Sequence, residues 1–223
     1  MKRTLVLCVL ALAICALPAM ADTLFTDFGG NMTYNCCTGW TVSGTGTVGT
    51  SFTAANEFTV AGSGNFNVSQ IDLAVGYVTG LNSFYASIWT DVGGLPGAMV
   101  PGALWQNLSS SQNFGGCCGL VTVSGISGVS LTGGDSYFMI LGPMNLNDTT
   151  WEAWNLNDQG VSGLDLYSTN GGTSWNSNGT QTLGAFDVIG APGGGGVPEP
   201  ASLFLLGSGL LGAVGTLRRK LNR

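Results

Sequence analysis

The positive charges of this chain lie only at its two ends, and this distribution divides the sequence into three parts. The 6 basic residues are Lys2 and Arg3 at the start and Arg218, Arg219, Lys220 and Arg223 at the end, and the chain contains no histidine. Of the 12 acidic residues, all except Glu199 lie between Asp22 and Val197. The middle part is therefore wholly anionic, and each end needs its own interpretation.

The N-terminal end has the features of an export signal. Lys2 and Arg3 precede an apolar run from Leu5 to Leu17, and Ala19-Met20-Ala21 offers an Ala-x-Ala cleavage site. A basic start, a short apolar run and a small-residue site are typical of a secretory signal peptide. We therefore predict that residues 1–21 are a signal peptide, which signal peptidase removes before Asp22.

The C-terminal end predicts a membrane segment. An uncharged run over residues 201–217 is followed by a basic end over residues 218–223. As a helix this run would be roughly 26 Å long, which is enough to cross the hydrocarbon of a bilayer. Basic residues that follow such a helix favour the cytoplasmic side. We predict one transmembrane helix over residues 201–217, placed in the inner membrane.

The motif before this helix completes a recognisable tail. Residues 197–223 resemble the PEP-CTERM sorting tail of Gram-negative bacteria, with a sorting motif formed by Val197, Pro198, Glu199, Pro200, Arg218, Arg219 and Lys220. The resemblance implies that an exosortase acts on the chain. It also implies an inner-membrane intermediate, followed by delivery to the cell envelope, the cell surface or the extracellular matrix.

The composition of the middle part excludes several functions. Without Lys or Arg it cannot neutralise phosphates, so nucleic acid is not an expected partner. Without His, Lys and Arg it lacks Ser-His nucleophiles, imidazole metal ligands, phosphate-binding loops and Schiff bases. The chemistry that remains uses carboxylates alone, chiefly glycoside cleavage by a pair of acids.

The pattern of apolar residues predicts strands. Ile71, Leu73, Val75 and Tyr77 alternate with polar or small residues, and further β-rich runs lie at residues 84–89, 136–141 and 185–189. Turn signals separate these runs at residues 93–97, 133–135 and 170–172. Such short strands with regular turns predict an all-β, antiparallel, jelly-roll-like sandwich over residues 22–190. A Gly-rich linker over residues 191–196 then leads to the tail.

Three segments of the middle part resemble the "choice-of-anchor" group of bacterial surface β-sandwich domains, and within it the domain labelled R. These segments are residues 87–97, 131–138 and 167–175. The resemblance implies a surface-displayed domain, and it supplies no catalytic residues.

Four cysteines remain after the signal peptide, as the adjacent pairs Cys36-Cys37 and Cys117-Cys118. An even number of cysteines in an exported protein indicates disulfides, and four cysteines allow three connectivities. We favour two bridges between the pairs, with at least one pair at a bend or bulge, because neighbours in a strand point to opposite faces. The similar sequences of residues 36–44 and 117–125 suggest two equivalent strands side by side. A thiolate metal or redox site is the alternative.

Six tryptophans suggest glycan contact or core packing: Trp40, Trp89, Trp105, Trp151, Trp154 and Trp175. The run that combines two tryptophans with an acid and an amide is the candidate glycan site, formed by Trp151, Glu152, Trp154 and Asn155. Oxygen ligands in the same stretch make Asp148, Glu152 and Asp158 candidates for Ca²⁺, with an ordinary solvated loop as the alternative. No other cofactor is expected.

We therefore expect an exported, non-catalytic protein of the cell surface or biofilm matrix, with a structural or glycan-contacting role towards extracellular polysaccharide. The alternatives are a carboxylate-only glycoside hydrolase and a calcium-dependent, lectin-like carbohydrate-binding module.

Overall fold

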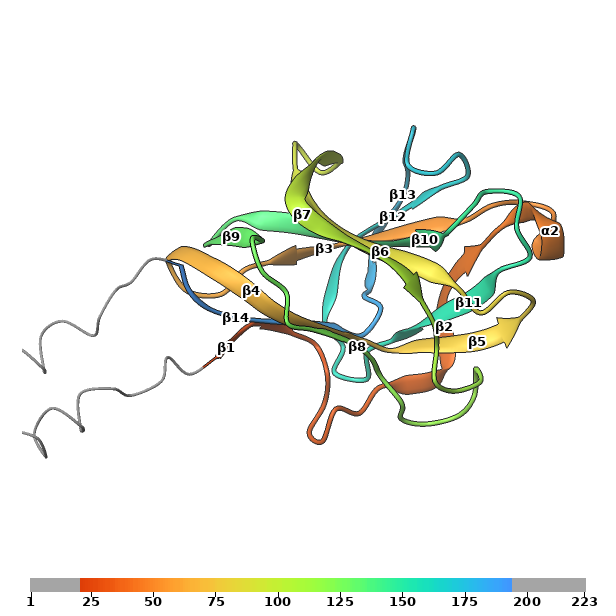
Figure 1. The fold of residues 1–223 in the computed structure, drawn as a ribbon, viewed down its shortest axis with the longest axis horizontal. Coiled ribbons are helices and arrows are strands. Elements are labelled where there is room, and N and C mark those ends of the chain that lie inside the picture. Colours follow the sequence, from red (N-terminus) through yellow and green to blue (C-terminus); the bar gives the residue numbers. More distant parts are fainter. Residues whose placement is uncertain (1–20, 194–223) are drawn as a thin grey trace, which may run out of the picture. The chain divides into compact units, whose positions relative to one another are not determined.

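Antiparallel strands account for more than half of residues 21–193, which are the residues that the computed structural model describes (Figure 1). Every pairing between named strands is antiparallel, so the predicted all-β class is confirmed. Within these residues no helix is both long and apolar enough to span a membrane. The predicted signal peptide, transmembrane helix and sorting motif lie outside the described residues.

The larger layer is a six-stranded sheet. In spatial order its strands are β13 (Asn176–Thr182), β12 (Ser162–Ser168), β3 (Thr53–Thr59), β10 (Ser136–Pro143), β6 (Phe84–Asp91) and β7 (Pro96–Leu108). Two of the predicted strands are β6 and β10, and β10 is buried on both faces as expected, because it lies inside the sheet. The predicted glycine-rich turns connect β6 to β7, β9 (Ser130–Gly133) to β10, and β12 to β13.

The second layer contains two smaller sheets. One is ordered β1 (Asp22–Thr26), β14 (Phe186–Pro192), β4 (Gly64–Leu73) and β8 (Val121–Ser124), with β9 also paired to β4. The other is ordered β2 (Asn35–Ser43), β11 (Trp151–Leu156) and β5 (Val75–Thr79). The short helix α2 (Thr45–Val48) follows β2. The predicted closing strand is β14, and the predicted alternation over residues 71–77 forms β4 and β5.

The two layers share one hydrophobic core, to which all three sheets contribute, as with Val42, Phe58, Ile71, Ile88, Met139, Trp154 and Phe186. The sandwich is therefore present, but it has three sheets instead of the two of a jelly roll. The division lies at Ala74, between β4 and β5. Its N–H donates to Ala185 O at 3.0 Å, and its carbonyl accepts from Asn155 N–H at 2.8 Å, so the chain changes partner strand there.

Trp154 joins the two smaller sheets inside the core. Its side chain is fully buried, and its ring centroid lies 5.6 Å from that of Phe186. The indole Nε1–H donates to Ala185 O at 3.1 Å. Gly184 allows this approach, because a Cβ at that position would lie 2.4 Å from the indole ring. This tryptophan therefore has a packing role.

Several carboxyl groups are buried, and the described residues offer them no cation, because the sequence from Asp22 to Val197 has no Lys, Arg or His. Burial raises the pKa of Asp27 and of Glu152 to about 8. Burial, together with the neighbouring Asp72 carboxyl, raises the pKa of Asp187 to about 7. Both carboxyl oxygens of Glu152 lack a hydrogen-bond partner among the described residues. Near neutral pH these groups hold protons inside the fold.

These protons predict a protein that is more stable in mild acid than in base. Between about pH 4 and pH 8 the unfolded chain has lost protons that the folded chain keeps, so stability falls as pH rises. The loss is about 1.4 kcal/mol per pH unit for each such group and is complete above the folded pKa. We expect Tm to fall by at least ~5 °C between pH 5 and pH 8.5 in thermal unfolding followed by circular dichroism.

Two variants test whether a buried carboxyl group causes this dependence of Tm on pH. Glu152→Gln should flatten the slope of Tm against pH. Glu57→Gln is the control for the substitution itself, because the Glu57 side chain on β3 is only half-buried. A Tm that rises between pH 5 and pH 8.5 would contradict the assignment.

Candidate functional site

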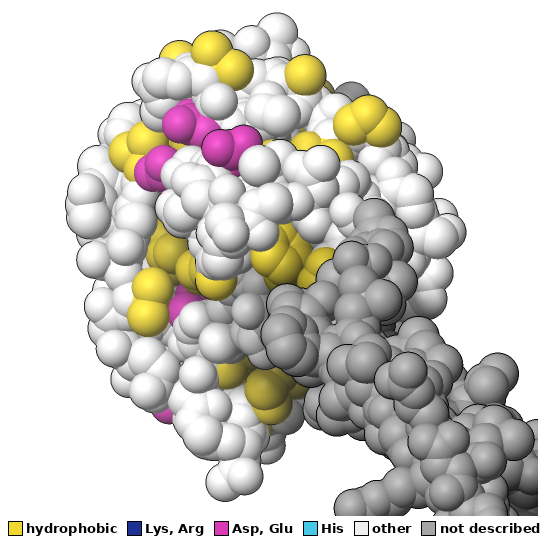
Figure 2. All heavy atoms as spheres, turned by 90° about the vertical axis from the view of Figure 1, so that its left-hand side faces the viewer, with side chains coloured by type: hydrophobic (Ala, Val, Ile, Leu, Met, Phe, Trp, Pro, Cys, Tyr) yellow, Lys and Arg dark blue, Asp and Glu magenta, His cyan; other side chains and the backbone are white. Residues whose placement is uncertain are grey.

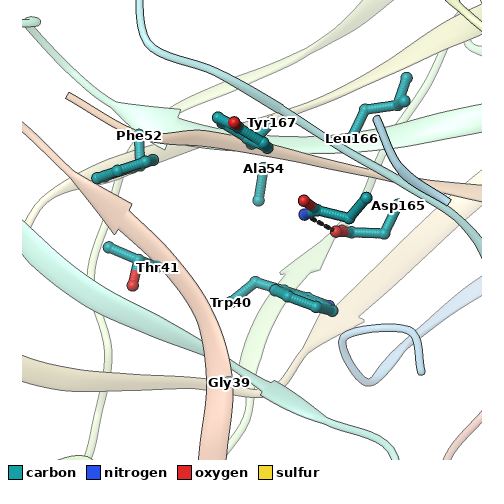
Figure 3. Close-up of a pocket in the computed structure, with 9 residues that line it drawn as sticks. Gly39, Trp40, Thr41, Phe52, Ala54, Asp165, Leu166 and Tyr167 are labelled. Carbon is teal, nitrogen blue, oxygen red and sulfur yellow. Dashed lines mark hydrogen bonds between the residues drawn. The ribbon is translucent and has the colours of Figure 1, made fainter. Parts of the chain in front are cut away.

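A cleft of about 460 Å³ opens where edge strands of the two layers face each other (Figure 3). β2, an edge strand of the three-stranded sheet, forms one wall. β12, β13 and the start of β3 form the other wall. The lining residues are Gly39, Trp40, Thr41, Phe52, Ala54, Asp165, Leu166, Tyr167 and Asn178.

The period of the strands places two of these side chains on the inner face of the six-stranded sheet. Asp165 and Tyr167 are alternate residues of β12, so they share one face. They lie opposite Asn56 and Ala54 of β3, and Ala54 belongs to the core between the layers. Asp165 and Tyr167 therefore face the cleft from the same side.

Three aromatic rings border the cleft. Figure 3 shows Trp40 on one side and Phe52 and Tyr167 on the other. The ring centroids of Phe52 and Tyr167 are 6.1 Å apart, at an interplanar angle of 48°. The Nε1–H of Trp40 donates to Thr182 O at 3.1 Å, which fixes the orientation of the indole. All three rings are half-buried, so each keeps part of its surface in contact with solvent.

Asp165 provides the charged group of the cleft. Its Oδ1 accepts from Asn56 Nδ2 at 2.6 Å, and its Oδ2 accepts from Asn178 Nδ2 at 2.5 Å. Burial raises the pKa of Asp165 to about 6, although these two amide hydrogen bonds oppose the rise. The group is therefore mostly ionised at neutral pH. Among the described residues that line the cleft, Asp165 is the one acid.

The chemistry of this lining suits a neutral polar ligand with apolar faces. Partly exposed aromatic rings offer surfaces for stacking. Asn178 and Thr41 offer acceptors and donors for hydroxyl groups, and Asp165, with 1% of its surface exposed, holds the Asn178 amide in place. No cation lines the cleft, so an anionic ligand would meet only the negative Asp165.

The residues that the sequence suggested for glycan contact are mostly internal. Glu152, Trp154 and Asn155 have 0% of their surface exposed, and Trp151 is half-buried. A sugar at the surface cannot stack on the Trp154 ring, because Phe186 and Gly184 pack against it. Of the two interpretations of Trp154, glycan contact and core packing, the structure supports core packing.

The three Ca²⁺ candidates do not come together. Asp148 precedes β11 and Asp158 follows it, and six residues of strand separate the ends of β11 by roughly 20 Å. Glu152 is buried between them. The Asp148 carboxylate accepts from Asn145 N–H and Thr150 N–H, and thus caps its own loop. Nothing in the described part of the chain joins these three acids into a metal site.

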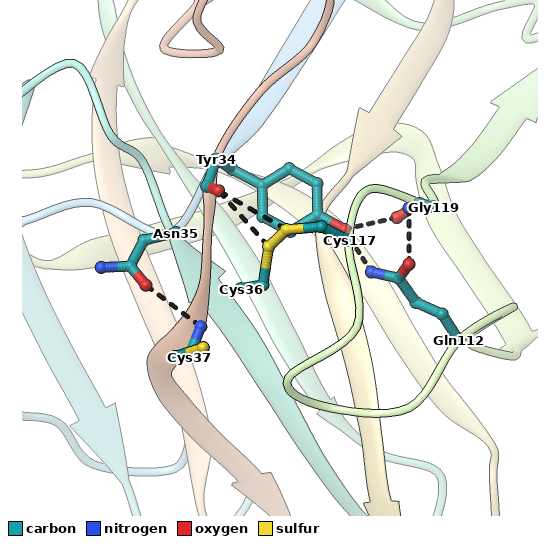
Figure 4. The surroundings of a disulfide bond; sticks show 7 residues. All are labelled: Tyr34, Asn35, Cys36, Cys37, Gln112, Cys117 and Gly119. Carbon is teal, nitrogen blue, oxygen red and sulfur yellow. Dashed lines mark hydrogen bonds between the residues drawn. A yellow bond between two sulfur atoms is a disulfide. The ribbon is translucent and has the colours of Figure 1, made fainter.

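The cysteines form one bridge instead of the two expected. Cys36 is bonded to Cys117, with their Cα atoms 5.7 Å apart, while Cys37 and Cys118 are free and exposed (Figure 4). The predicted bulge is confirmed: Asn155 pairs with Gly39 and Leu156 with Asn35, so residues 36–38 of β2 bulge away from β11. The suggested pair of equivalent strands is also wrong, since β2 and β8 lie in different sheets.

Sequence reasoning did not identify the cleft. Trp40 appeared only as one of six tryptophans, and Phe52, Tyr167 and Asn178 carried no signal. Trp40 and Tyr167 lie on different sheets, so only the tertiary fold brings them to one cleft.

Comparison with curated proteins gave no match. Among solved structures, this chain is similar to one described as the cysteine protease and lectin-like domains of Cwp84, a surface layer associated protein of Clostridium difficile. The identity is 14%, the TM-score is 0.43, and the match covers 64% of this chain and 32% of that one. The chain therefore spans about a third of the protein that it matches.

The C-terminal segment gives the decisive match. Residues 196–220 match the family described as the PEP-CTERM protein-sorting motif, as the Pro-Glu-Pro signature predicted. This motif implies processing by an exosortase and sorting of an exported protein to the cell surface. The chain thus carries a PEP-CTERM sorting signal behind an all-β domain.

Proposed function

We propose that residues 22–190 form a non-catalytic surface module that binds neutral polysaccharide in the cleft between β2 and β12. The observation that carries this proposal is the set of three aromatic rings around the Asp165–Asn178 pair. Sugar rings present C–H faces that stack on aromatic rings, and their hydroxyl groups hydrogen-bond to carboxylates and amides. The sorting motif brings such a module to the place where extracellular polysaccharide is found.

The lack of basic residues narrows the ligand class. A sulfated or uronic-acid polymer would approach a domain with no Lys, Arg or His between Asp22 and Val197. Repulsion would therefore oppose its binding. We propose neutral glycans of the biofilm matrix as the partners.

The two alternative functions, glycoside hydrolysis and calcium-dependent sugar binding, require more carboxyl or other oxygen groups than the described lining of the cleft provides. A glycoside hydrolase needs two carboxyl groups, about 5 to 9.5 Å apart, on either side of the scissile bond. Asp165 is the one acid among the described lining residues. A calcium-dependent lectin needs several oxygen ligands around one ion, and the candidates Asp148, Glu152 and Asp158 lie apart along β11. Non-catalytic binding needs only the groups that are present.

Binding should depend on the aromatic rings of the cleft. We expect the full chain, purified in detergent, to bind at least one of dextran, mannan or cello-oligosaccharides in isothermal titration calorimetry. Trp40→Ala and Tyr167→Ala should each weaken binding at least ~10-fold, which corresponds to about 1.4 kcal/mol. The control is Trp105→Ala on β7, because β7 lies at the opposite edge of the six-stranded sheet and Trp105 is similarly half-buried.

Two outcomes would contradict this proposal. Equal losses for Trp40→Ala and Trp105→Ala would show that the rings act through stability and not through the cleft. Release of reducing sugar from these glycans, abolished by Asp165→Asn, would favour the hydrolase.

Sorting should depend on the proline residues of the motif. In a host that contains an exosortase, Pro198→Ala combined with Pro200→Ala should retain the protein in the membrane fraction, because the signature that the enzyme recognises is lost. Cell fractionation and immunoblotting measure this. Pro192→Ala is the matched control, since Pro192 ends β14 and precedes the matched residues. Normal surface delivery of the double variant would contradict recognition through this motif.

A further inference from the structure

Three sulfur atoms gather at the bulge of β2. The Sγ atoms of Cys36, Cys117 and Cys118 all lie within 4.8 Å of one another, and Cys36 is bonded to Cys117. Cys118 is free, so a thiol stands beside an existing disulfide. In the described part of the chain no other group of three potential metal-ligating side chains comes this close.

The loop that carries Cys117 and Cys118 is held from both sides (Figure 4). Before the pair, Gly115 N–H donates to Cys36 O at 2.9 Å. After the pair, Tyr34 Oη–H donates to Gly119 O at 2.8 Å, and Gly119 N–H donates to Gln112 Oε1 at 2.6 Å. These contacts do not involve either sulfur of the pair. They keep both cysteines within reach of Cys36, whichever of the two is bonded to it.

Both cysteines of the pair are exposed, while Cys36 is half-buried. Exposure makes the Cys118 sulfur accessible, and the thiolate is the form of a cysteine that attacks a disulfide. Glycines flank the pair at positions 115, 116 and 119, and Gly115 has a φ of 87°, so the local backbone is built from residues with few steric restrictions.

We propose that Cys36, Cys117 and Cys118 form a thiol–disulfide exchange site in which Cys36 is shared between two partners. The Cys118 thiolate attacks Cys36 Sγ, the Cys36–Cys118 bond forms, and the Cys36–Cys117 bond breaks. Cys117 leaves as a thiolate and takes a proton from water. One disulfide and one thiol exist before and after the step, so no oxidant or reductant is consumed.

The Cys36–Cys117 and Cys36–Cys118 bridged forms close loops of nearly the same length. The Cys36–Cys117 bridge has a sequence separation of 81, and the Cys36–Cys118 bridge would enclose one residue more. The loop-closure contribution to stability changes only with the logarithm of loop length, so it does not favour either form. In both forms one exposed thiol remains in the loop. The exported domain therefore always offers a reactive sulfur at this site to other thiols and disulfides.

Cys37 provides an internal control. It is exposed and free like Cys118, but its sulfur does not belong to the three-sulfur group. Its backbone N–H donates to Asn35 Oδ1 at 3.0 Å, which holds the bulge. Its thiol should label with alkylating reagents without taking part in exchange.

The test uses the full chain with Cys8 and Cys15 changed to Ser, purified in detergent without reductant. The protein is incubated at pH 8.5, alkylated with N-ethylmaleimide, acidified and digested with pepsin, because residues 4–217 contain no Lys or Arg for trypsin. Fragment-ion mass spectrometry then locates the label. We expect label on Cys37, and label shared between Cys117 and Cys118. Label on Cys117 reports the exchange, because Cys117 is bonded to Cys36 in the structure.

Variants provide a second readout. Cys117→Ser should retain one disulfide, now Cys36–Cys118, and one free thiol at Cys37. Cys118→Ser should retain Cys36–Cys117, also with one free thiol. Three free thiols in Cys117→Ser would overturn the proposal, as would label on Cys118 but never on Cys117 in the parent protein. A Cys37–Cys118 bridge, which would leave no free thiol in the parent, would overturn it equally.

Discussion

The absence of any cation between Asp22 and Val197 governs how this domain is built. A buried carboxylate in most proteins finds an Arg, Lys or His partner, and here that option does not exist. Several of the buried acids instead accept hydrogen bonds from amides, hydroxyls and backbone N–H groups. Asp27 accepts from Phe186 N–H, and Asp72 accepts from Thr122 and Gln70. These contacts do not neutralise charge, and burial raises the pKa of Asp27 and of Glu152 to about 8, so both groups hold a proton near neutral pH.

The lack of basic residues also determines how the carboxylate beside the cleft is held. Asp165 links β12 to Asn56 on β3 and to Asn178 on β13, and these two amides oppose the effect of burial on its pKa. Asp165 has 1% of its surface exposed, so it acts on the cleft by holding the exposed Asn178 amide and not by direct contact with a ligand. The lack of basic residues thus leaves a neutral amide as the polar group that this pair presents to the cleft.

Short-range patterns in the sequence predicted much of the fold, and long-range contacts account for what was missed. Alternation over residues 71–77 and the glycine-rich turns identified strands, because these signals are local. The split of the second layer at Ala74 was not predictable, since it depends on Ala185 and Asn155, which are distant in the chain. Trp154 shows the same limit for the site. Its sequence environment suggested a surface platform, whereas Gly184, thirty residues later, makes room for its ring in the core. The sorting motif, in contrast, is read from consecutive residues and was identified correctly.

The strand β2 carries both the exchange site and one wall of the cleft, and its pairing keeps them separate. Cys36 lies in the bulge, where residues 36–38 have no partner on β11. From Gly39 to Ser43 the strand pairs with Asn155 to Trp151 without interruption, and the Trp40 indole is fixed by Thr182. The two bridged forms would therefore differ in the exposed Cys117-Cys118 pair, between the anchored residues Gly115 and Gly119, and in the unpaired bulge. The exchange site and the cleft thus lie on separate parts of one edge strand, the first on its unpaired residues and the second on its paired ones.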